Sequence, residues 1–432
     1  MWQMEYGVAW QDSARWRATF DEGMARNMPT IIEFPTVVQD ILAQYGDLFA
    51  NEPERRHFAE YLTGLFIAER KTVSGINREF AVTTDQSCLN RWITAVDWDA
   101  KALNQRRLEL LQRDSATHYT PHGVIAIDNT LIDHDGKLIE DAGWFWDHAE
   151  QRHLIAHDYL IANYVCASSK HYPLEFRRFR KKEVCAAGES FKNHTVLCKE
   201  LVDWVVEKAI PGDFTFDSYF TNAEILNHID SKKRNYVGDL KFNRTITVDG
   251  KDWKANEWVK TQLGPLCRRK TTVDGKEQWY FTKSIRIPGV THTVRIVVLW
   301  KRQRDSEPRK ILITNRTYWE VHRILKTYRK RWTGTETFRR DGKQHLGMGA
   351  CQLRSGESQT RHMYLVFLAY SALMGQLRHD RAQEWAHVRL TTIGESCRAM
   401  FRETLGKTIA WVVEQVQQGQ SLPAIKAHLA LP

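Results

Sequence analysis

The chain has 432 residues, 42% of them hydrophobic, and a formal net charge of +10. This length is too great for one compact core, so we expect a soluble globular protein of two or three domains. The excess of Lys and Arg favours a polyanionic partner, because clustered cations release counterions when they bind phosphate backbones.

The cysteines and the apolar runs exclude two classes of protein. The seven cysteines form no C-x-x-C pair, which excludes a zinc finger and predicts buried thiols in a reducing compartment. The longest apolar run, residues 363–374, is too short to span a bilayer, and the first residues show no signal segment. We therefore expect a cytoplasmic protein with no membrane partner.

Residues 1–115 are expected to form a helical domain, because apolar residues recur at intervals of three and four in "RRHFAEYLTGLFIAER" and "ALNQRRLELLQR". Segment 74–94 predicts two short helices about a turn, with Asp85 or Ser87 capping the second. Two interpretations of this segment stay open. It is either a DNA-binding helix-turn-helix or an ordinary helix pair.

Residues 116–242 change to an α/β pattern. Runs rich in β-branched and aromatic residues predict strands, and amphipathic runs predict helices between them. The expected elements are strands at 124–133, 153–169 and 171–182, a helix at 193–210, a strand at 213–220, a helix at 222–233 and a strand at 235–242. This order predicts a mixed α/β sheet covered by helices.

Residues 243–304 are expected to form an all-β insertion in that α/β domain. "VDGK" occurs at 248–251 and at 273–276, and Asp-Gly between strand-like runs predicts a tight hairpin turn. The α/β domain resumes over residues 305–378 with a strand at 310–316 followed by long helices. Residues 379–432 predict an amphipathic helical region used for subunit contacts.

Asp128 is the first candidate functional carboxylate. In "VIAIDNTLI" it shares one face of the strand with Val124 and Ala126, while Ile125 and Ile127 share the other. An ionised group in an apolar sheet is costly unless it is paired or bound to a metal. Asp128 is therefore either the partner of a nearby Arg or a metal ligand.

Asp217 and Glu336 are the second and third candidates. Asp217 follows Phe216 at the end of a strand, where ligand sites gather. Glu336 lies in the strongly basic segment "YRKRWTGTETFRRDGKQHLGMG", residues 328–349. The pattern "TGTE" is also a capping box, in which Thr333 starts a new helix after a break at Gly334.

Acidic residues on two neighbouring strands and one helix suit a particular chemistry. Their carboxylate oxygens can hold two Mg²⁺ ions, and paired metals support in-line attack on a phosphodiester. The basic residues around Glu336 would then hold the phosphates.

Three blocks of the sequence resemble a known family. "AIDNT", "FDSYF" and "YRKRWTGTETFRRDGKQHLG" are similar to the catalytic blocks of bacterial insertion-sequence transposases of the DDE type, in the subgroup named for its Tyr-Arg-Glu-Lys signature. The resemblance covers about residues 70–375 and implies a ribonuclease-H-like fold. It implies that Asp128, Asp217 and Glu336 form the catalytic, metal-binding triad.

The resemblance also assigns DNA-binding residues. Tyr328, Arg331 and Lys343 match the other signature positions, which contact the DNA phosphates, and Arg340 lies on the same helical face as Glu336 and Lys343. In the family, three residues separate the Arg from the Glu, whereas this chain has four, and the extra residue lies at Gly334.

Transposases of this subgroup carry a β-rich insertion before the last catalytic helix, as residues 243–304 are expected to do here. An aromatic residue of that insertion can stabilise a flipped base when the DNA end forms a hairpin. Trp300 and Trp332 are candidates for that role, with core packing as the alternative. His148, His153 and His157 are candidates for a metal cluster, but a strand does not bring residues four apart together, so a structural or DNA-contacting role is favoured.

The function implied is that of a DNA transposase. It would bind the terminal inverted repeats of its element, cleave the ends with two Mg²⁺ ions, for which Mn²⁺ can substitute, and join the 3′-hydroxyls to target DNA, with or without hairpin ends. Two ends must be held together, which implies a homodimer in a synaptic complex at the bacterial nucleoid. The alternatives are another ribonuclease-H-like metal-dependent nuclease, or a domesticated transposase acting as a DNA-binding regulator.

Overall fold

The computed structural model describes residues 31–429 except 135, 137, 148, 149, 186, 187, 189 and 379. The first thirty residues of the expected helical domain and His148 therefore lie outside the described residues. No helix in the described part of the chain is both long and apolar enough to cross a membrane.

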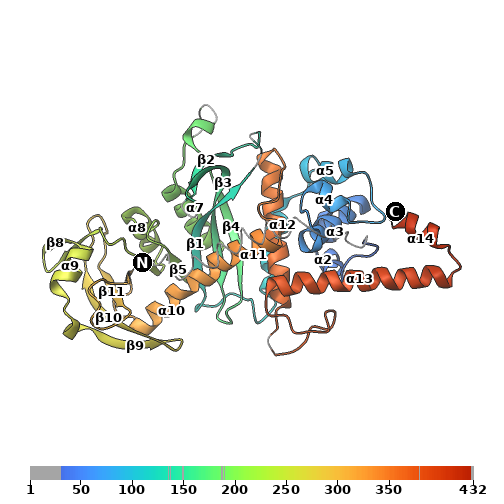
Figure 1. Ribbon diagram of the computed structural model, residues 1–432. Coiled ribbons are helices and arrows are strands. Elements are labelled where there is room, and N and C mark those ends of the chain that lie inside the picture. The colour runs from blue at the N-terminus through green and yellow to red at the C-terminus, as the bar shows by residue number, and fades with distance from the viewer. Residues whose placement is uncertain are drawn as a thin grey trace.

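A large mixed sheet forms the centre of the molecule (Figure 1). Its strands are β1 (Val124–Asp133), β2 (Gly143–Asp147), β3 (Arg152–Val165), β4 (His171–Phe179), β5 (Asp213–Phe216), β6 (Tyr236–Asp239), β9 (Arg269–Val273), β10 (Lys276–Ile285), β11 (Val294–Trp300) and β12 (Lys310–Thr314). The strand order is β2-β3-β1-β5-β6-β12-β11-β10-β9, and β4 also pairs with β3. The neighbours β1, β5 and β6 are parallel, and the remaining pairs are antiparallel. The predicted mixed α/β fold is confirmed.

The two faces of β1 point to different sides of the sheet, as the alternation of its residues predicts. Ile125 and Ile127 are fully buried in a core shared with α7 (His194–Glu207) and α8 (Ala223–Ser231). Ala126 faces the opposite side, where its Cβ lies near Gly334 of the long helix described below. Asp128 has the same parity as Ala126, so it too faces that helix and not the apolar core.

The insertion differs from the prediction in two ways. It contains β7 (Thr245–Val248) and β8 (Lys251–Lys254), followed by a helix, α9 (Ala255–Gln262), and a short 3₁₀ turn, η3 (Pro265–Cys267). The expectation of an all-β segment is thus wrong, because Ala255, Trp258 and Val259 recur at helical spacing and are buried together. In addition β12 pairs with both β6 and β11, so β9, β10 and β11 extend the central sheet.

Both Asp-Gly hairpin turns are confirmed. Val248 pairs with Lys251 and Val273 pairs with Lys276, so each turn has two residues. Asp249 and Gly250 have φ of 51° and 80°, and Asp274 and Gly275 have φ of 50° and 73°. Two successive positive φ values are what a type I′ turn requires, and Asp-Gly tolerates them best.

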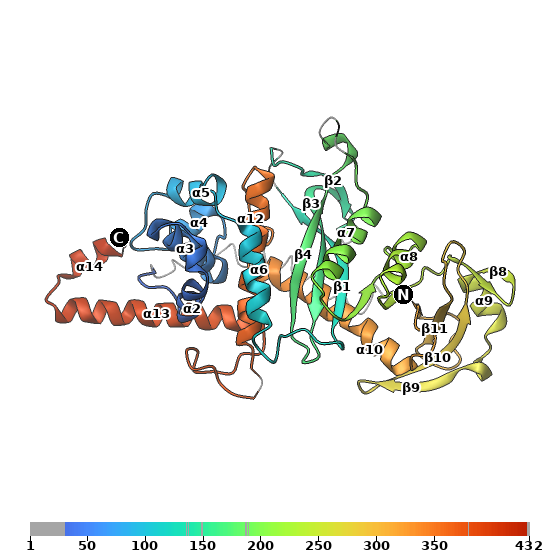
Figure 2. The same ribbon diagram turned by 180° about the vertical axis from the view of Figure 1, so that it is seen from behind.

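Helices from both ends of the chain pack into one group beside the sheet. They are α2 (Thr36–Tyr45), η1 (Gly46–Leu48), α3 (Glu52–Ile67), α4 (Val73–Asn77), α5 (Gln86–Thr94), α6 (Ala100–Leu111), α12 (Gly356–Gln376), α13 (Ile393–Gln417) and α14 (Leu422–His428). Figures 1 and 2 show this group at one end of the molecule and the insertion at the other. The helix pair predicted in 74–94 is confirmed as α4 and α5, and Asp85 caps α5 by accepting a hydrogen bond from the Ser87 amide.

The basic segment forms one continuous helix. It consists of α10 (Val321–Trp332), the π-helical turn η4 (Thr333–Thr337) and α11 (Phe338–His345). Thr333 has helical φ and ψ of −59° and −44°, so it is not a helix cap. The predicted break at Gly334 is therefore wrong, because the backbone widens into a π turn there instead of stopping.

The described cysteines are all unpaired thiols. Cys166, Cys198 and Cys351 are buried as expected, whereas Cys267 is exposed, because it lies in the surface turn η3.

Candidate active site on the central strands and the long helix

Asp128 lies within β1 and faces the long helix. Its Oδ2 accepts a hydrogen bond of 2.9 Å from the Arg331 guanidinium, and the two side chains are only 18% and 12% exposed. Burial raises the pKa of Asp128 to about 7; Arg331 opposes this rise, while Asp217 and Glu336 add to it. Only charges that lie near one another interact in this way, so the carboxylates of the three candidate residues share one region.

Asp217 is the first residue after β5. Its Oδ1 accepts a hydrogen bond of 2.9 Å from the Tyr219 amide, and its carbonyl accepts one of 2.9 Å from the Thr221 hydroxyl. These contacts fix the chain as it leaves the sheet. In the parallel pair β1–β5, Ala126 lies opposite Thr215, so Asp128 and Asp217 follow at the same level, at the carboxyl end of β5, where ligand-binding residues gather in α/β folds.

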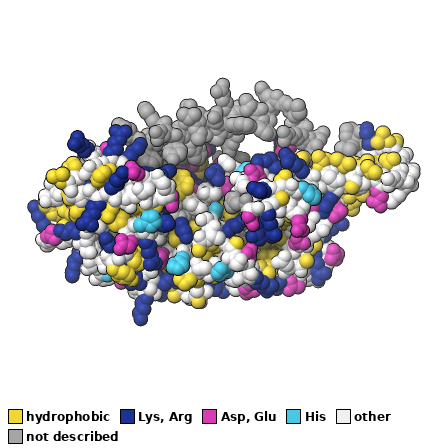
Figure 3. Space-filling model, turned by 90° about the horizontal axis from the view of Figure 1, so that it is seen from below, with side chains coloured by type: hydrophobic (Ala, Val, Ile, Leu, Met, Phe, Trp, Pro, Cys, Tyr) yellow, Lys and Arg dark blue, Asp and Glu magenta, His cyan; other side chains and the backbone are white. Residues whose placement is uncertain are grey.

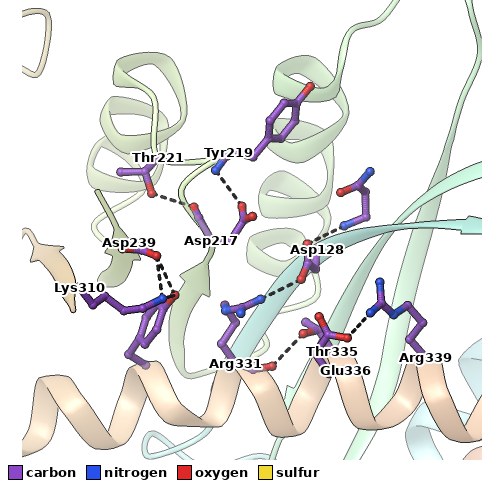
Figure 4. A network of polar contacts seen from close by, with 12 residues as sticks. Asp128, Asp217, Tyr219, Thr221, Asp239, Lys310, Arg331, Thr335, Glu336 and Arg339 are labelled. Carbon is purple, nitrogen blue, oxygen red and sulfur yellow. Dashed lines mark hydrogen bonds and ion pairs between the residues drawn. The ribbon is translucent and has the colours of Figure 1, made fainter. Parts of the chain in front are cut away.

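Glu336 lies in the π turn η4 and forms an ion pair with Arg339. It lines a small surface hollow together with Asp128 and Asn129 of β1. Figure 4 shows Asp128 above the helix that carries Arg331 and Glu336, with Asp217 beside it.

The π turn accounts for the extra residue between Arg331 and Glu336. A π turn bonds residue i to residue i+5, so it holds one more residue than an α turn without interrupting the helix. Arg331, before Gly334, donates a hydrogen bond to Asp128, and Glu336, after Gly334, lines the same hollow as Asp128 and adds to the rise in its pKa. The helix therefore continues through Gly334 with four residues between Arg331 and Glu336.

The oxygen donors suit a hard divalent cation such as Mg²⁺. The three carboxylates do not surround a single ion position in this structure. Within the described residues, no three acidic, His or Cys side chains are close enough to share a metal. In this conformation the cations Arg331 and Arg339 neutralise Asp128 and Glu336 instead. The donor chemistry thus fits a divalent metal, while two arginines pair with two of the three carboxylates.

A second polar cluster lies on the other side of Asp217, and the sequence analysis missed part of it. Lys310, the first residue of β12, donates hydrogen bonds of 2.8 Å to Asp239 and 3.1 Å to the Tyr328 hydroxyl. Asp239 ends β6 and is close enough to Asp217 for that charge to raise its pKa, although burial is the larger cause. The signal was available, because Asp239 ends a strand-like run as Asp217 does.

The remaining candidates are placed as follows. Lys343 donates a hydrogen bond of 2.7 Å to the Leu131 carbonyl, at the end of β1, and Arg340 pairs with Asp341 at 2.9 Å. Trp332 is 62% exposed at the end of α10. Trp300 is 0% exposed, with the Arg268 guanidinium 4.0 Å above its ring, which favours core packing over a DNA contact. It lies at the end of β11 with its ring covered, and the core-packing alternative holds.

The histidines considered as metal ligands have protein partners. The ring of His157 is bonded to His134 and to the Glu140 carbonyl, each at 2.8 Å. Burial, the largest cause, lowers the pKa of His157 to about 3, and the ring is therefore neutral. His153 packs edge-on against Trp146.

Comparison with known families gives one match. A family model described as DDE superfamily endonuclease matches residues 44–279, more than half of the chain. The matched range contains Asp128 and Asp217 and ends before Glu336. A search of curated proteins finds no match.

Proposed function

The chain belongs to the DDE superfamily of endonucleases, and from this premise we propose that it is a DNA transposase of the insertion-sequence type with a Tyr-Arg-Glu-Lys signature. It binds the terminal inverted repeats of its element, cleaves the ends and joins the freed 3′-hydroxyls to target DNA. The observation that carries the proposal is the π turn η4, through which Arg331 bonds to Asp128 and Glu336 lines the same hollow despite the extra residue.

We assign the metal-binding role to Asp128, Asp217 and Glu336. Endonucleases of this superfamily use divalent ions, and such ions, Mg²⁺ or Mn²⁺, lower the pKa of a bound water and neutralise charge on a reacting phosphate. The protein's own contribution is to hold the three carboxylates on β1, after β5 and on the long helix. In the absence of DNA and ions, Arg331 and Arg339 balance the negative charges of Asp128 and Glu336.

We assign binding of the DNA phosphates to basic residues on the long helix. Lys343 is exposed and tied to the end of β1, so its ammonium lies near the Asp128 edge of the sheet. Arg340 is 60% exposed on the same helix, and Trp332 offers an exposed ring beside Arg331. Charged donors near exposed aromatic rings suit a nucleic-acid backbone whose bases are partly unstacked.

We assign end recognition to the helices of residues 31–115 and subunit contact to the C-terminal helices. In α13 Ile409, Val413 and Val416 are 55%, 49% and 59% exposed and recur at i, i+4 and i+7. Figure 3 shows hydrophobic side chains gathered along this arm, which projects from the rest of the molecule. An apolar stripe of this kind favours pairing with a second copy, as a synaptic complex needs.

The test is cleavage and strand transfer on short duplexes made from the DNA that flanks the coding region, in Mg²⁺. The parent protein should nick at the end of an imperfect inverted repeat and join the 3′-hydroxyl to a plasmid. Glu336→Gln should lose cleavage by at least about a thousandfold while its affinity for the end duplex stays within about twofold, because a ligand is lost and the shape is kept.

The outcomes separate the rivals. Cleavage without strand transfer would favour a nuclease of the same fold, and sequence-specific binding without cleavage would favour a regulatory protein. Cleavage by Glu336→Gln close to the parent rate would overturn the triad. Detection of hairpin ends on denaturing gels would assign the excision route.

A further inference from the structure

A pocket of about 420 Å³ lies next to the candidate active site. It is lined by Ser218, which follows Asp217, and by residues at the ends of β6 and β12, including Asp239, Lys241, Arg309 and Lys310. Three of these side chains are cations and one is a carboxylate. The pocket is thus a positively charged recess beside the carboxylate that would meet the scissile phosphate.

Lys310 is a cation of this pocket whose position is fixed by two hydrogen bonds. Its ammonium group has three N–H donors, of which one is used by Asp239 at 2.8 Å and one by the Tyr328 hydroxyl at 3.1 Å. The ammonium also lies 4.9 Å from the centre of the Tyr328 ring. Its remaining donor is available on the side where Lys310 lines the pocket, with the side chain 32% exposed.

The Tyr328 hydroxyl is occupied by the same cluster. It accepts a hydrogen bond from Lys310 and donates its only proton toward Asp239, across a longer distance of 3.4 Å. A phosphate oxygen only accepts hydrogen bonds. In this arrangement Tyr328 therefore has no proton to offer a phosphate, whereas Lys310 has both a proton and a positive charge.

We propose that Lys310 is a DNA-binding residue that holds a backbone phosphate next to the cleaved bond, in the pocket beside Asp217, and that Tyr328 and Asp239 position its ammonium. The ammonium stays charged at neutral pH. Burial lowers the pKa of Lys310, but the neighbouring Asp239 and Tyr328 raise it, and the net direction is upward. The DNA strand as ligand rests on the proposed function, and the assignment goes beyond it by giving the phosphate contact to a residue outside the signature.

Binding experiments without cleavage test this assignment. The affinities of the parent and of its variants are measured in Ca²⁺ on an end duplex and on an unrelated duplex, over a series of salt concentrations. Lys310→Met should weaken both affinities by a similar factor, roughly fivefold or more, and reduce the slope of log K against log salt by about 0.9, as the loss of one phosphate contact does. Lys310→Arg should retain most of the slope.

Two further variants separate a phosphate contact from simple neutralisation of Asp239. If Lys310 only neutralises Asp239, then Lys310→Met with Asp239→Asn should recover parental binding, and this result would overturn the proposal. If Lys310 binds phosphate, the double variant stays weak, and Asp239→Asn alone binds DNA as well as the parent or better. Tyr328→Phe should keep the parental salt slope, and a reduced slope in this variant would move the contact to Tyr328.

The matched control is another Lys–Asp pair. Lys232 contacts Asp203 at 2.7 Å, away from the pocket, and Lys232→Met should leave the affinity and the slope unchanged. These binding measurements are independent of cleavage. A parent protein that binds DNA but neither cleaves nor transfers strands defeats the proposed function, whereas an unchanged slope in Lys310→Met defeats the Lys310 assignment alone.

Discussion

Gly334→Ala offers a direct measure of how tightly the long helix is seated on the sheet. In a solvent-exposed helix, Ala stabilises relative to Gly by about 1 kcal/mol. At Gly334, however, an added Cβ would lie 2.8 Å from Cγ2 of Val165 and 3.1 Å from Cβ of Ala126. Both residues are almost fully buried in strands, at 1% and 0% exposure, so neither can move away cheaply.

The expected net effect is a loss of stability. Overpacking of this kind costs about 1–3 kcal/mol, and the gain in helix propensity offsets about 1 kcal/mol of it, which leaves a loss of roughly 1 kcal/mol and at most about 2. The control is Gly406→Ala in α13, where the added Cβ meets nothing within 4 Å and the variant should gain up to about 1 kcal/mol. Urea unfolding of both variants gives the two values, at equal m-values.

Opposite signs for the two variants would support the close approach of η4 to β1 and β3. If Gly334→Ala were as stable as the parent or more stable, the helix would have to sit farther from the sheet than the structure has it. Glu336 and Arg331 would then also lie farther from Asp128, because their positions depend on the same close packing of the helix on the sheet.

Three further outcomes are expected. The His362 ring is hydrogen-bonded to the Tyr61 hydroxyl at 2.9 Å and to the Gly347 carbonyl at 3.0 Å. Burial lowers the pKa of His362 to about 4. Between pH 6.5 and 4 the unfolded chain therefore binds a proton at this residue that the folded protein does not. The stability advantage of the parent over His362→Gln should therefore be full above pH 6.5 and shrink by about 2–3 kcal/mol as the pH falls to 4.5 in urea titrations; a constant difference would show that the ring is charged in the fold. Lys343→Ala should weaken binding to all duplexes by a similar factor in a filter-binding assay, and a loss confined to the end sequence would contradict a phosphate contact. Removal of divalent ions with a chelator should stop cleavage but shift the thermal midpoint little, because Arg331 and Arg339 already neutralise Asp128 and Glu336; a large drop would mean that the ions hold the fold together.

Local patterns in the sequence were sufficient for several features. The alternation in β1 placed Asp128 opposite the apolar side of the strand, and the Asp-Gly pairs placed both hairpin turns. Helical spacing and Asp85 placed α4 and α5. Each of these depends on the preferences of neighbouring residues for dihedral angles and for one face of an element, which the sequence states directly.

The same patterns misled where packing outweighs local preference. "TGTE" has the residues of a capping box, yet Thr333 is helical, because Gly334 lets the backbone pass close to Val165 and Ala126 without ending the helix. The strand-like composition of the insertion predicts an all-β segment, yet Ala255, Trp258 and Val259 form the buried face of a helix. The burial of Trp300 could not be read from its own strand, because the covering guanidinium belongs to Arg268.

Strand parity and residue chemistry are local properties, so the candidate carboxylates and the basic block are recognisable in the sequence. How these residues meet depends on the tertiary structure. The π turn lets the helix continue so that Glu336 lines the same hollow as Asp128, and the pairing of β12 with β6 brings Lys310 to Asp239 across 71 residues. Such contacts depend on the order of strands in the sheet and on the seating of a helix against it, and no single segment of the chain encodes either.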